Sequence, residues 1–190
     1  MDVRKLAFLI ILTSFCLAIQ IIPRPPDVEF TSFFCFVGGL TEGAMFGALL
    51  GSITMLVNGF LSPYGFGGLN IPFQVAGMIV AAVLGSFYRR FTPNVGFSAR
   101  FSVETAVLGA FIALVYELIT NFGYGLQLVL LGEGQSLALL TAFATGFFFS
   151  LLHVVSNTLV FGGLFLPVTN ALYRLRLDDV HWLKKERLYS

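Results

Sequence analysis

The sequence predicts an all-α integral membrane protein, a bundle of six transmembrane helices with both termini in the cytoplasm. Of its 190 residues, 57% are hydrophobic and only 11% are charged, which is more apolar than a water-soluble domain of this length requires. A glycine repeat favours the same class, because glycine at every fourth helical position leaves a bare face where a neighbouring helix can approach closely in lipid. The repeat lies at Gly39, Gly43, Gly47 and Gly51, and small residues recur at this spacing at Gly77, Ala81 and Gly85.

The first helix is expected from Leu6 to Ile22, directly after Arg4 and Lys5. The apolar run is long and no small-x-small cleavage site follows it, so we interpret it as a retained span and not as a secretory signal. Residues 23 to 27 are rich in proline and are expected to form a short, stiff turn.

The next two segments are expected to form a pair that is linked through glycine. The second segment is expected from Val28 to about Thr41, and the third continues to about Leu61, with the turn between them at Gly38 and Gly39. Residues 58 to 71 contain the densest group of turn-forming residues in the chain, with aromatic residues between them, so they predict a loop.

The fourth helix is expected to begin at Pro72, a favourable residue for a first helical turn, and to end at Arg90. Proline and asparagine at 93 and 94 then interrupt the chain. A fifth helix is expected to start after Arg100 and to reach about Asn121.

The run from residue 137 to 173 has no charged side chain apart from His153 and is too long for one span. A hydrocarbon core about 30 Å thick takes about 20 helical residues. Counting back from Arg174 therefore begins the sixth helix near Val154. Residues 122 to 146 would then lie at the outer surface as an apolar lid or an interfacial helix.

An alternative arrangement places residues 137 to 152 in the sixth helix. In this arrangement the helix starts at Leu137 and breaks at Gly162 and Gly163, which would move His153 towards the cytoplasm. We favour the shorter helix, and the sequence leaves both arrangements open.

The distribution of basic residues predicts the orientation of the bundle. With six spans and both termini inside, Arg24 alone among the eleven lysines and arginines lies outside. This agrees with the excess of positive charge that cytoplasmic loops carry. Residues 1 to 173 would form the substrate-binding membrane domain, and residues 174 to 190 a cytosolic tail of mixed charge anchored by Trp182.

Most of the remaining polar side chains gather at the expected outer ends of the helices. Polar groups are costly in lipid, so we expect them to face a shared cavity. Each one alone fits an interhelical hydrogen bond, but their convergence at one depth favours a small-molecule pocket under a lid formed by residues 60 to 69. The candidate substrate-binding residues are Asn58, Tyr64, Asn70, Gln74, Tyr116, Glu117, Asn121, His153 and Asn157.

Three other acidic residues are given other roles. Glu29 and Glu42 lie at the two ends of the second segment, where solvation at the membrane interface would explain them. Glu104 lies four residues after Arg100, a spacing typical of an ion pair within one helix.

Motifs for catalysis and cofactor binding are missing from the sequence. There is no Gly-x-x-x-x-Gly-Lys-Ser/Thr phosphate loop and no nucleophile or zinc-protease motif. His153 and His181 have no second ligand at metal-binding spacing, and Cys16 and Cys35 are isolated within apolar runs. We therefore expect a protein that is not an enzyme and that has no cofactor, no metal and no nucleic acid partner.

Four stretches carry a resemblance to a known family. They are residues 26–31 (Pro-Asp-Val-Glu-Phe-Thr), 51–65, 74–85 and 153–157 (His-Val-Val-Ser-Asn). In order and spacing they resemble the substrate-binding S components of energy-coupling factor (ECF) vitamin transporters, over nearly the whole chain. The resemblance implies a multi-pass cell-membrane protein that binds a vitamin or related micronutrient near the outer surface. It also implies a membrane coupling (T) subunit and two cytosolic ATPases as partners, and toppling in the membrane to release substrate inside.

The resemblance also assigns parts of the chain to roles. Ser14 and Ala18 are similar to the small-residue face that docks on the coupling subunit, where the family usually has alanine at both positions. The loop from Asn58 to Asn70 is similar to the family's gating loop. Several members stack tryptophan on the ligand, and here tyrosine and phenylalanine would replace it. A non-transporting membrane scaffold or a solitary vitamin carrier are the alternatives, and the sequence does not name the substrate.

The predicted topology can be tested by labelling single cysteines on intact cells. A membrane-impermeant thiol reagent should react with Ser62→Cys in the outer loop and should not reach Ser190→Cys at the cytoplasmic terminus. Reaction of both positions from the same side would contradict the six-span arrangement.

Overall fold

The computed structural model describes residues 3–23, 25, 27–91 and 99–174, and within these ranges the chain is helical without strands. Five of the helices are long and apolar enough to cross a membrane, which supports the predicted all-α membrane class. The elements are α1 (Val3–Ile21), α2 (Thr31–Glu42), α3 (Ala44–Leu61), the short 3₁₀ helix η1 (Gly68–Asn70), α4 (Ile71–Phe91), α5 (Ala99–Leu130) and α6 (Gln135–Arg174).

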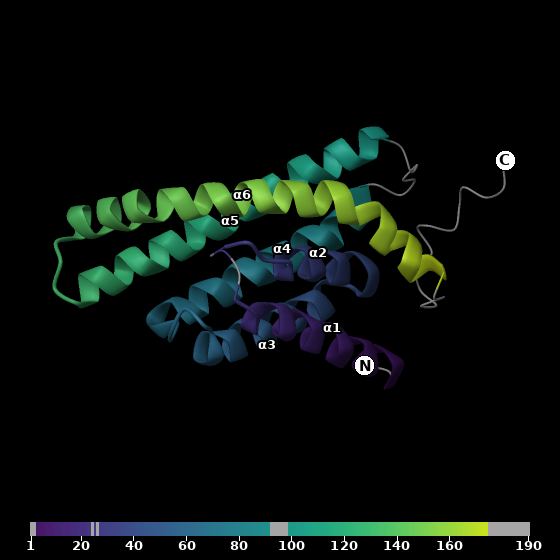
Figure 1. The fold of residues 1–190 in the computed structure, drawn as a ribbon, viewed down its shortest axis with the longest axis horizontal. Helices are drawn as coiled ribbons and strands as arrows, with labels where there is room; N and C mark the ends of the chain where they lie inside the picture. Colours follow the sequence, from purple (N-terminus) through teal and green to yellow (C-terminus); the bar gives the residue numbers. More distant parts are fainter. Residues whose placement is uncertain (1–2, 24, 26, 92–98, 175–190) are drawn as a thin grey trace.

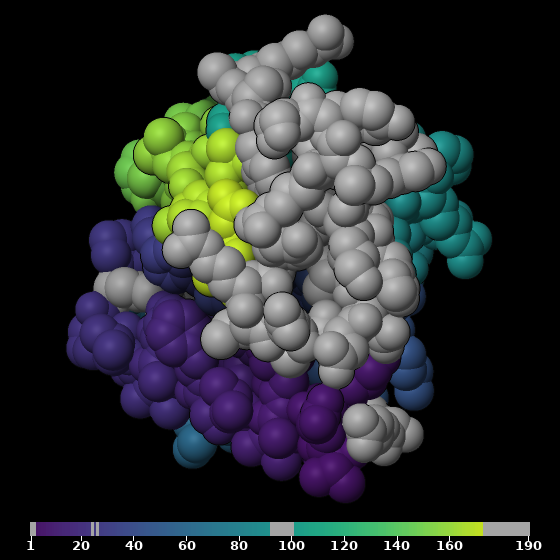
Figure 2. Space-filling model, turned by 90° about the vertical axis from the view of Figure 1, so that its right-hand side faces the viewer, coloured from purple at the N-terminus to yellow at the C-terminus, as the bar shows by residue number. Residues whose placement is uncertain are grey.

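Consecutive helices run in opposite directions through the bundle (Figure 1). The first turns of α1 and the last turns of α6 therefore lie at the same end, and both reach the surface of the end face seen in Figure 2. At the opposite end, the hairpin of α5 and α6 extends beyond the other helices (Figure 1).

One face of α5 is apolar and exposed along most of its length. Side chains three or four residues apart lie on one face of a helix. Such a face would normally be buried in a water-soluble protein, whereas in a bilayer it is the surface that lipid tails cover. The exposed residues are Val103, Val107, Phe111, Leu114, Leu118 and Phe122.

Helix α2 is short and lies in the middle of the bundle. Ten of its 12 residues are buried. The neighbouring helices approach it so closely that a Cβ added at Gly39 would overlap the carbonyl oxygen of Ala82 in α4, and one at Gly85 would overlap that of Phe36 in α2. The close approach predicted from the spacing of small residues is therefore confirmed at these glycines.

The sequence suggested that the glycine repeat lies on a single helix. In the structure it is divided between α2 and α3. Gly43 has a φ of 102° and separates α2 from α3, because glycine adopts this backbone conformation without the steric cost that a side chain brings. The turn predicted at Gly38 and Gly39 is wrong, since both residues lie inside α2. Gly47 of α3 still contacts α2, next to the carbonyl oxygen of Cys35.

Basic side chains hold the C-terminal end of α2. Arg89 Nη1 donates to the carbonyl oxygen of Thr41 at 3.1 Å, one of the terminal carbonyls that a helix leaves without an internal partner. Lys5 Nζ lies 3.1 Å from the Glu42 carboxylate. Glu42 is therefore part of an ion pair that joins α1 to α2, and solvation alone does not explain it.

The expected ends of the last two helices are wrong. Helix α5 continues from Asn121 to Leu130, and α6 begins at Gln135. Residues 122 to 146 thus form the end of α5, a short turn and the start of α6, and not a lid. The alternative arrangement, which places residues 137 to 152 in the sixth helix, is confirmed on that point. Its predicted break is wrong, because α6 passes through Gly162 and Gly163 without interruption.

The turn between α5 and α6 explains where α5 ends. Gly132 has a φ of 101°, its N–H donates to Val129 O at 3.0 Å, and the N–H of Glu133 donates to Leu128 O at 3.1 Å. This pair of hydrogen bonds around a left-handed glycine is the Schellman motif that closes many helices. At about 1.5 Å per residue, α5 and α6 are about 48 and 60 Å long, well beyond a hydrocarbon core of about 30 Å.

The contact between Gly85 and α2 predicts a large difference between two alanine substitutions. Gly85→Ala should lower the free energy of unfolding by about 1 to 3 kcal/mol, because backbone atoms of α2 cannot move aside for the new methyl group. Gly163→Ala is the matched control, since nothing lies near that position and alanine favours helix. Thermal unfolding in detergent measures both, and equal midpoints would contradict the close packing.

Candidate functional site

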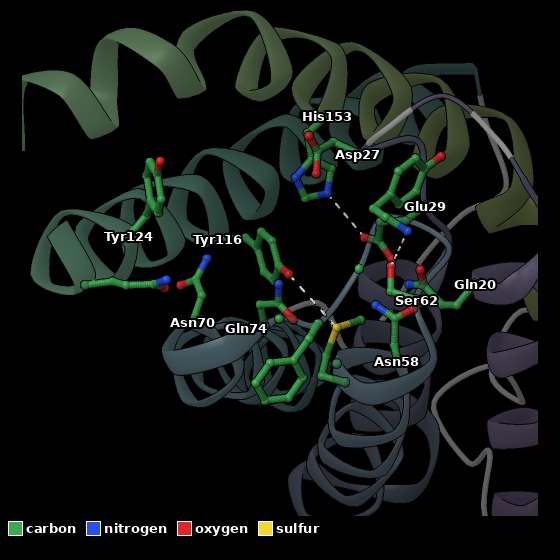
Figure 3. A pocket seen from close by; sticks show the side chains of 17 residues that line it. Gln20, Asp27, Glu29, Asn58, Ser62, Asn70, Gln74, Tyr116, Tyr124 and His153 are labelled. Carbon is green, nitrogen blue, oxygen red and sulfur yellow. Dashed lines mark hydrogen bonds and ion pairs between the residues drawn. The ribbon is translucent and has the colours of Figure 1, made fainter. Parts of the chain in front are cut away.

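A cavity of about 380 Å³ lies where α1 and α3 end and where α2 and α4 begin. This volume is within the range of small-molecule sites. Its walls come from separate parts of the chain, and polar side chains from opposite sides point into it (Figure 3). The lining residues are Gln20, Asp27, Glu29, Met55, Asn58, Gly59, Ser62, Tyr64, Gly65, Phe66, Gly67, Asn70, Gln74, Tyr116, Tyr124, Gln127 and His153.

His153 connects two buried carboxylates. Its Nδ1 lies 2.6 Å from Glu117 Oε1, and its Nε2 lies 3.2 Å from Glu29 Oε1. His153 is 1% exposed, Glu29 is 5% exposed and Glu117 is 7% exposed. Charged side chains are rarely buried to this extent without partners. The three residues form one linked group, here named the Glu-His-Glu cluster.

The number of hydrogen-bond donors that the cluster requires indicates its net charge. An ionised carboxylate only accepts, and a neutral imidazole donates from one of its two ring nitrogens. Because each ring nitrogen faces a carboxylate, the group needs one proton more than a neutral imidazole provides. With that proton, on the imidazole or on a carboxyl group, the Glu-His-Glu cluster carries a single net negative charge.

Glu29 is placed by the first turn of α2. Its carboxylate accepts from the backbone N–H groups of Thr31 and Ser32, and the hydroxyl of Ser32 also donates to it. A carboxylate at this point meets the unpaired N–H groups and the positive end of the helix dipole. Gln20 Nε2 donates to Thr31 Oγ1 at 2.9 Å, which links the end of α1 to the same turn.

A second set of contacts holds Glu117 and His153 from behind. Ser150 Oγ donates to Glu117 Oε2 at 2.7 Å and accepts from Asn121 Nδ2 at 3.1 Å. The ring of Tyr116 meets the imidazole edge to face, with centroids 5.1 Å apart. Long packed helices thus fix the orientation of the His153 ring that faces the cavity.

Three amide side chains on the cavity wall have an oxygen without a hydrogen-bond partner. Asn58 Oδ1, Asn70 Oδ1 and Gln74 Oε1 are each shielded from solvent and contact no donor in the described part of the chain. An unpaired buried polar atom costs about 1 to 3 kcal/mol. Because all three residues line the cavity, a bound molecule could supply the missing donors.

The loop between α3 and η1, residues 62 to 67, forms one wall. It is shorter than the loop predicted for residues 58 to 71, because α3 continues to Leu61 and α4 begins at Ile71. The lid predicted from residues 60 to 69 stays a prediction. Tyr64 and Phe66 are exposed and line the cavity, and Gly65 between them has a φ of 103°. The loop is attached to the end of α3 through a 2.8 Å hydrogen bond from Gly67 N to Gly59 O.

Six of the nine candidate substrate-binding residues line the cavity. The other three, Glu117, Asn121 and Asn157, lie behind its wall. Glu117 and Asn121 support His153 and Ser150, and Asn157 is fully buried, with its Nδ2 donating to His153 O at 3.3 Å. The residues that line the cavity as expected are Asn58, Tyr64, Asn70, Gln74, Tyr116 and His153.

The sequence predicted that His153 lies at the start of the sixth helix. In the structure it lies near the middle of α6.

The residues on the predicted docking face lie elsewhere. Ser14 and Ala18 are exposed on α1 and do not line the cavity, so their docking role stays a prediction.

Several cavity residues were not predicted from the sequence. The interpretation of Glu29 as a solvated end residue is wrong, because Glu29 is buried and bonded to His153. The pattern Glu-x-Thr-Ser at the start of α2, a carboxylate just before a helix, was a usable signal for it. Tyr124 and Gln127 were not predicted, because the expected end of the fifth helix, about Asn121, lies before them.

In the described part of the chain, no group of histidine, cysteine or acidic residues is arranged to hold a metal ion.

No protein-family model, curated protein or solved structure matches this chain.

The Glu-His-Glu cluster predicts strong coupling between Glu117 and His153. Glu117→Ala and His153→Ala should each lower the free energy of unfolding by about 3 to 5 kcal/mol, because each leaves a buried polar or charged partner behind. The double variant should cost less than the sum, by about 0.5 to 3 kcal/mol. Chemical unfolding in detergent gives all three values.

Ser150→Ala is the control for this cycle, because it removes one hydrogen bond to Glu117 and leaves the imidazole in place. It should cost less than either single substitution. Additive effects of Glu117→Ala and His153→Ala would contradict a direct pair.

Proposed function

We propose that this protein is a substrate-binding subunit of the cell membrane, with six spans and cytoplasmic termini, which captures a small molecule at the outer face for import. It does not act as an enzyme in this proposal. The cavity residues bind and orient the molecule, and energy for transport comes from partner subunits.

The observation that carries the proposal is the set of unpaired amide oxygens on the cavity wall. If Asn58, Asn70 and Gln74 served only to join helices, each oxygen would be expected to find a donor within the bundle. Within residues 3–23, 25, 27–91 and 99–174, all three instead lack a donor, and all three lie at a cavity of small-molecule size. A ligand with several donors would satisfy them, which favours a binding site over a scaffold.

The resemblance of four stretches to ECF S components supplies the partners in this proposal. The partners would be a membrane coupling subunit and two cytosolic ATPases. Ser14 and Ala18 are small, exposed and four residues apart on α1, so a helix of the coupling subunit could approach α1 closely there. Helix α1 contributes Gln20 to the described cavity lining, but neither Ser14 nor Ala18 is part of it, which leaves docking and binding separable.

Native mass spectrometry of the purified full-length chain tests the binding function. The protein should retain one small molecule per chain. Asn58→Ala should weaken binding of that molecule by about ten-fold to a hundred-fold through the loss of a hydrogen bond in a desolvated site. Because Asn58 Oδ1 has no hydrogen-bond partner among the residues that the structure describes, thermal stability without ligand should not fall.

Asn170→Ala is the matched control, since Asn170 is exposed on α6 and is not part of the cavity wall. A chain that retains no small molecule would favour the scaffold.

Uptake by cells expressing the protein with Ala18→Trp separates the remaining alternatives. Lost uptake with retained binding supports a coupling partner, and unchanged uptake supports a solitary carrier.

A further inference from the structure

The charged groups around the cavity are predominantly acidic. Asp27 and Glu29 line the cavity directly. Glu117 is not part of the lining and contacts His153, which is. Among the lining residues that the structure describes there is no lysine or arginine. His153 is the only group there that can carry positive charge, and it is shared between Glu29 and Glu117.

The charge is costly in this position. The Glu-His-Glu cluster has a single net negative charge even with its additional proton, and its side chains are almost completely buried in an apolar helix bundle. Removing a net charge from water costs several kcal/mol, and the N–H groups at the start of α2 offset only part of this cost at Glu29. A positive group in the cavity would offset that cost, whereas an anion would add to it.

Aromatic rings complete the walls of the cavity. Tyr64, Phe66, Tyr116 and Tyr124 come from the α3–η1 loop and from α5. The face of an aromatic ring attracts a cation within about 6 Å and also stacks on flat heterocycles. In Figure 3, Tyr116 and Tyr124 lie across the cavity from Glu29, so a flat ligand could contact a carboxylate and a ring together.

Amide groups add hydrogen bonding but do not set the sign of the ligand's charge. Rotation of an amide by 180° exchanges its oxygen with its nitrogen, so Asn58, Asn70 and Gln74 can match donors or acceptors. The carboxylates have no such freedom, because an ionised carboxylate only accepts. They determine which charge the cavity prefers.

Building on the proposed function, we infer that the ligand is an organic cation, a flat molecule whose positively charged nitrogen group lies at the acidic end of the cavity, beside Asp27 and Glu29. A compact metal ion would not use the aromatic walls or the available volume. An organic cation uses the acidic end, the rings and the amides at once.

Three compounds of nearly the same shape and different charge test this inference. They are benzamidinium, which is a cation, benzamide, which is neutral, and benzoate, which is an anion. Calorimetric titration of the purified full-length protein should give benzamidinium an affinity about ten-fold to a hundred-fold above benzamide, from the attraction between its charge and the acidic end of the cavity. Benzoate should bind more weakly than benzamide.

Substitutions locate the preference within the cavity. Glu29→Gln should remove most of the difference between benzamidinium and benzamide. Glu133→Gln is the matched control, because it removes the same charge at the α5–α6 turn, outside the cavity lining. Asp27→Asn is a second test variant, since asparagine tolerates the positive φ of 60° at that residue.

The outcomes separate this inference from the proposed function. Equal affinities for the three compounds, or an anion as the compound that co-purifies, overturn the cation inference and leave a small-molecule site standing. If none of the three binds and nothing co-purifies, both fall. A co-purified cation, or a benzamidinium preference that Glu29→Gln abolishes and Glu133→Gln retains, supports the inference.

Discussion

The burial of the short helix α2 is the constraint on which the rest of the structure depends. The helix has 12 residues and lies in the middle of the bundle. Its neighbours pack against it with their backbones close together, and Gly39, Gly47 and Gly85 make this close approach possible. In lipid, where apolar side chains gain little by leaving the solvent, such close packing is a main source of helix association. The glycines therefore determine which helices surround α2.

The position of α2 also creates the acidic end of the cavity. The first N–H groups of a helix need partners, and Glu29 supplies them for Thr31 and Ser32. Because α2 starts inside the bundle, its N-terminal carboxylate is buried beside His153 of α6 and not in water at the membrane surface. A local rule of helix termini, applied to a buried helix, thus brings a charged group to the cavity wall.

The long hairpin of α5 and α6 supports the other side of the cavity. Glu117, Asn121 and Ser150 join the two helices behind His153, and Gly146 lets Asn121 approach α6 closely. Side chains held by two packed helices lose little further freedom when a ligand binds, which favours affinity. The α3–η1 loop on the facing wall has glycine at positions of positive φ, so the cavity combines a fixed wall with a wall of more adaptable backbone.

The sequence by itself determined the all-helical membrane class, the existence of a loop between the third and fourth long segments and the close approach at several glycines, since these depend on composition and local spacing. It also identified half of the polar residues that line the cavity, because polar side chains in apolar helices are rare. Only the tertiary structure decided the ends of α5 and α6 and the role of Glu29. An apolar run looks the same whether a helix stops at a membrane surface or continues along a packed partner, and a carboxylate before a helix looks the same whether its surroundings are water or a neighbouring histidine.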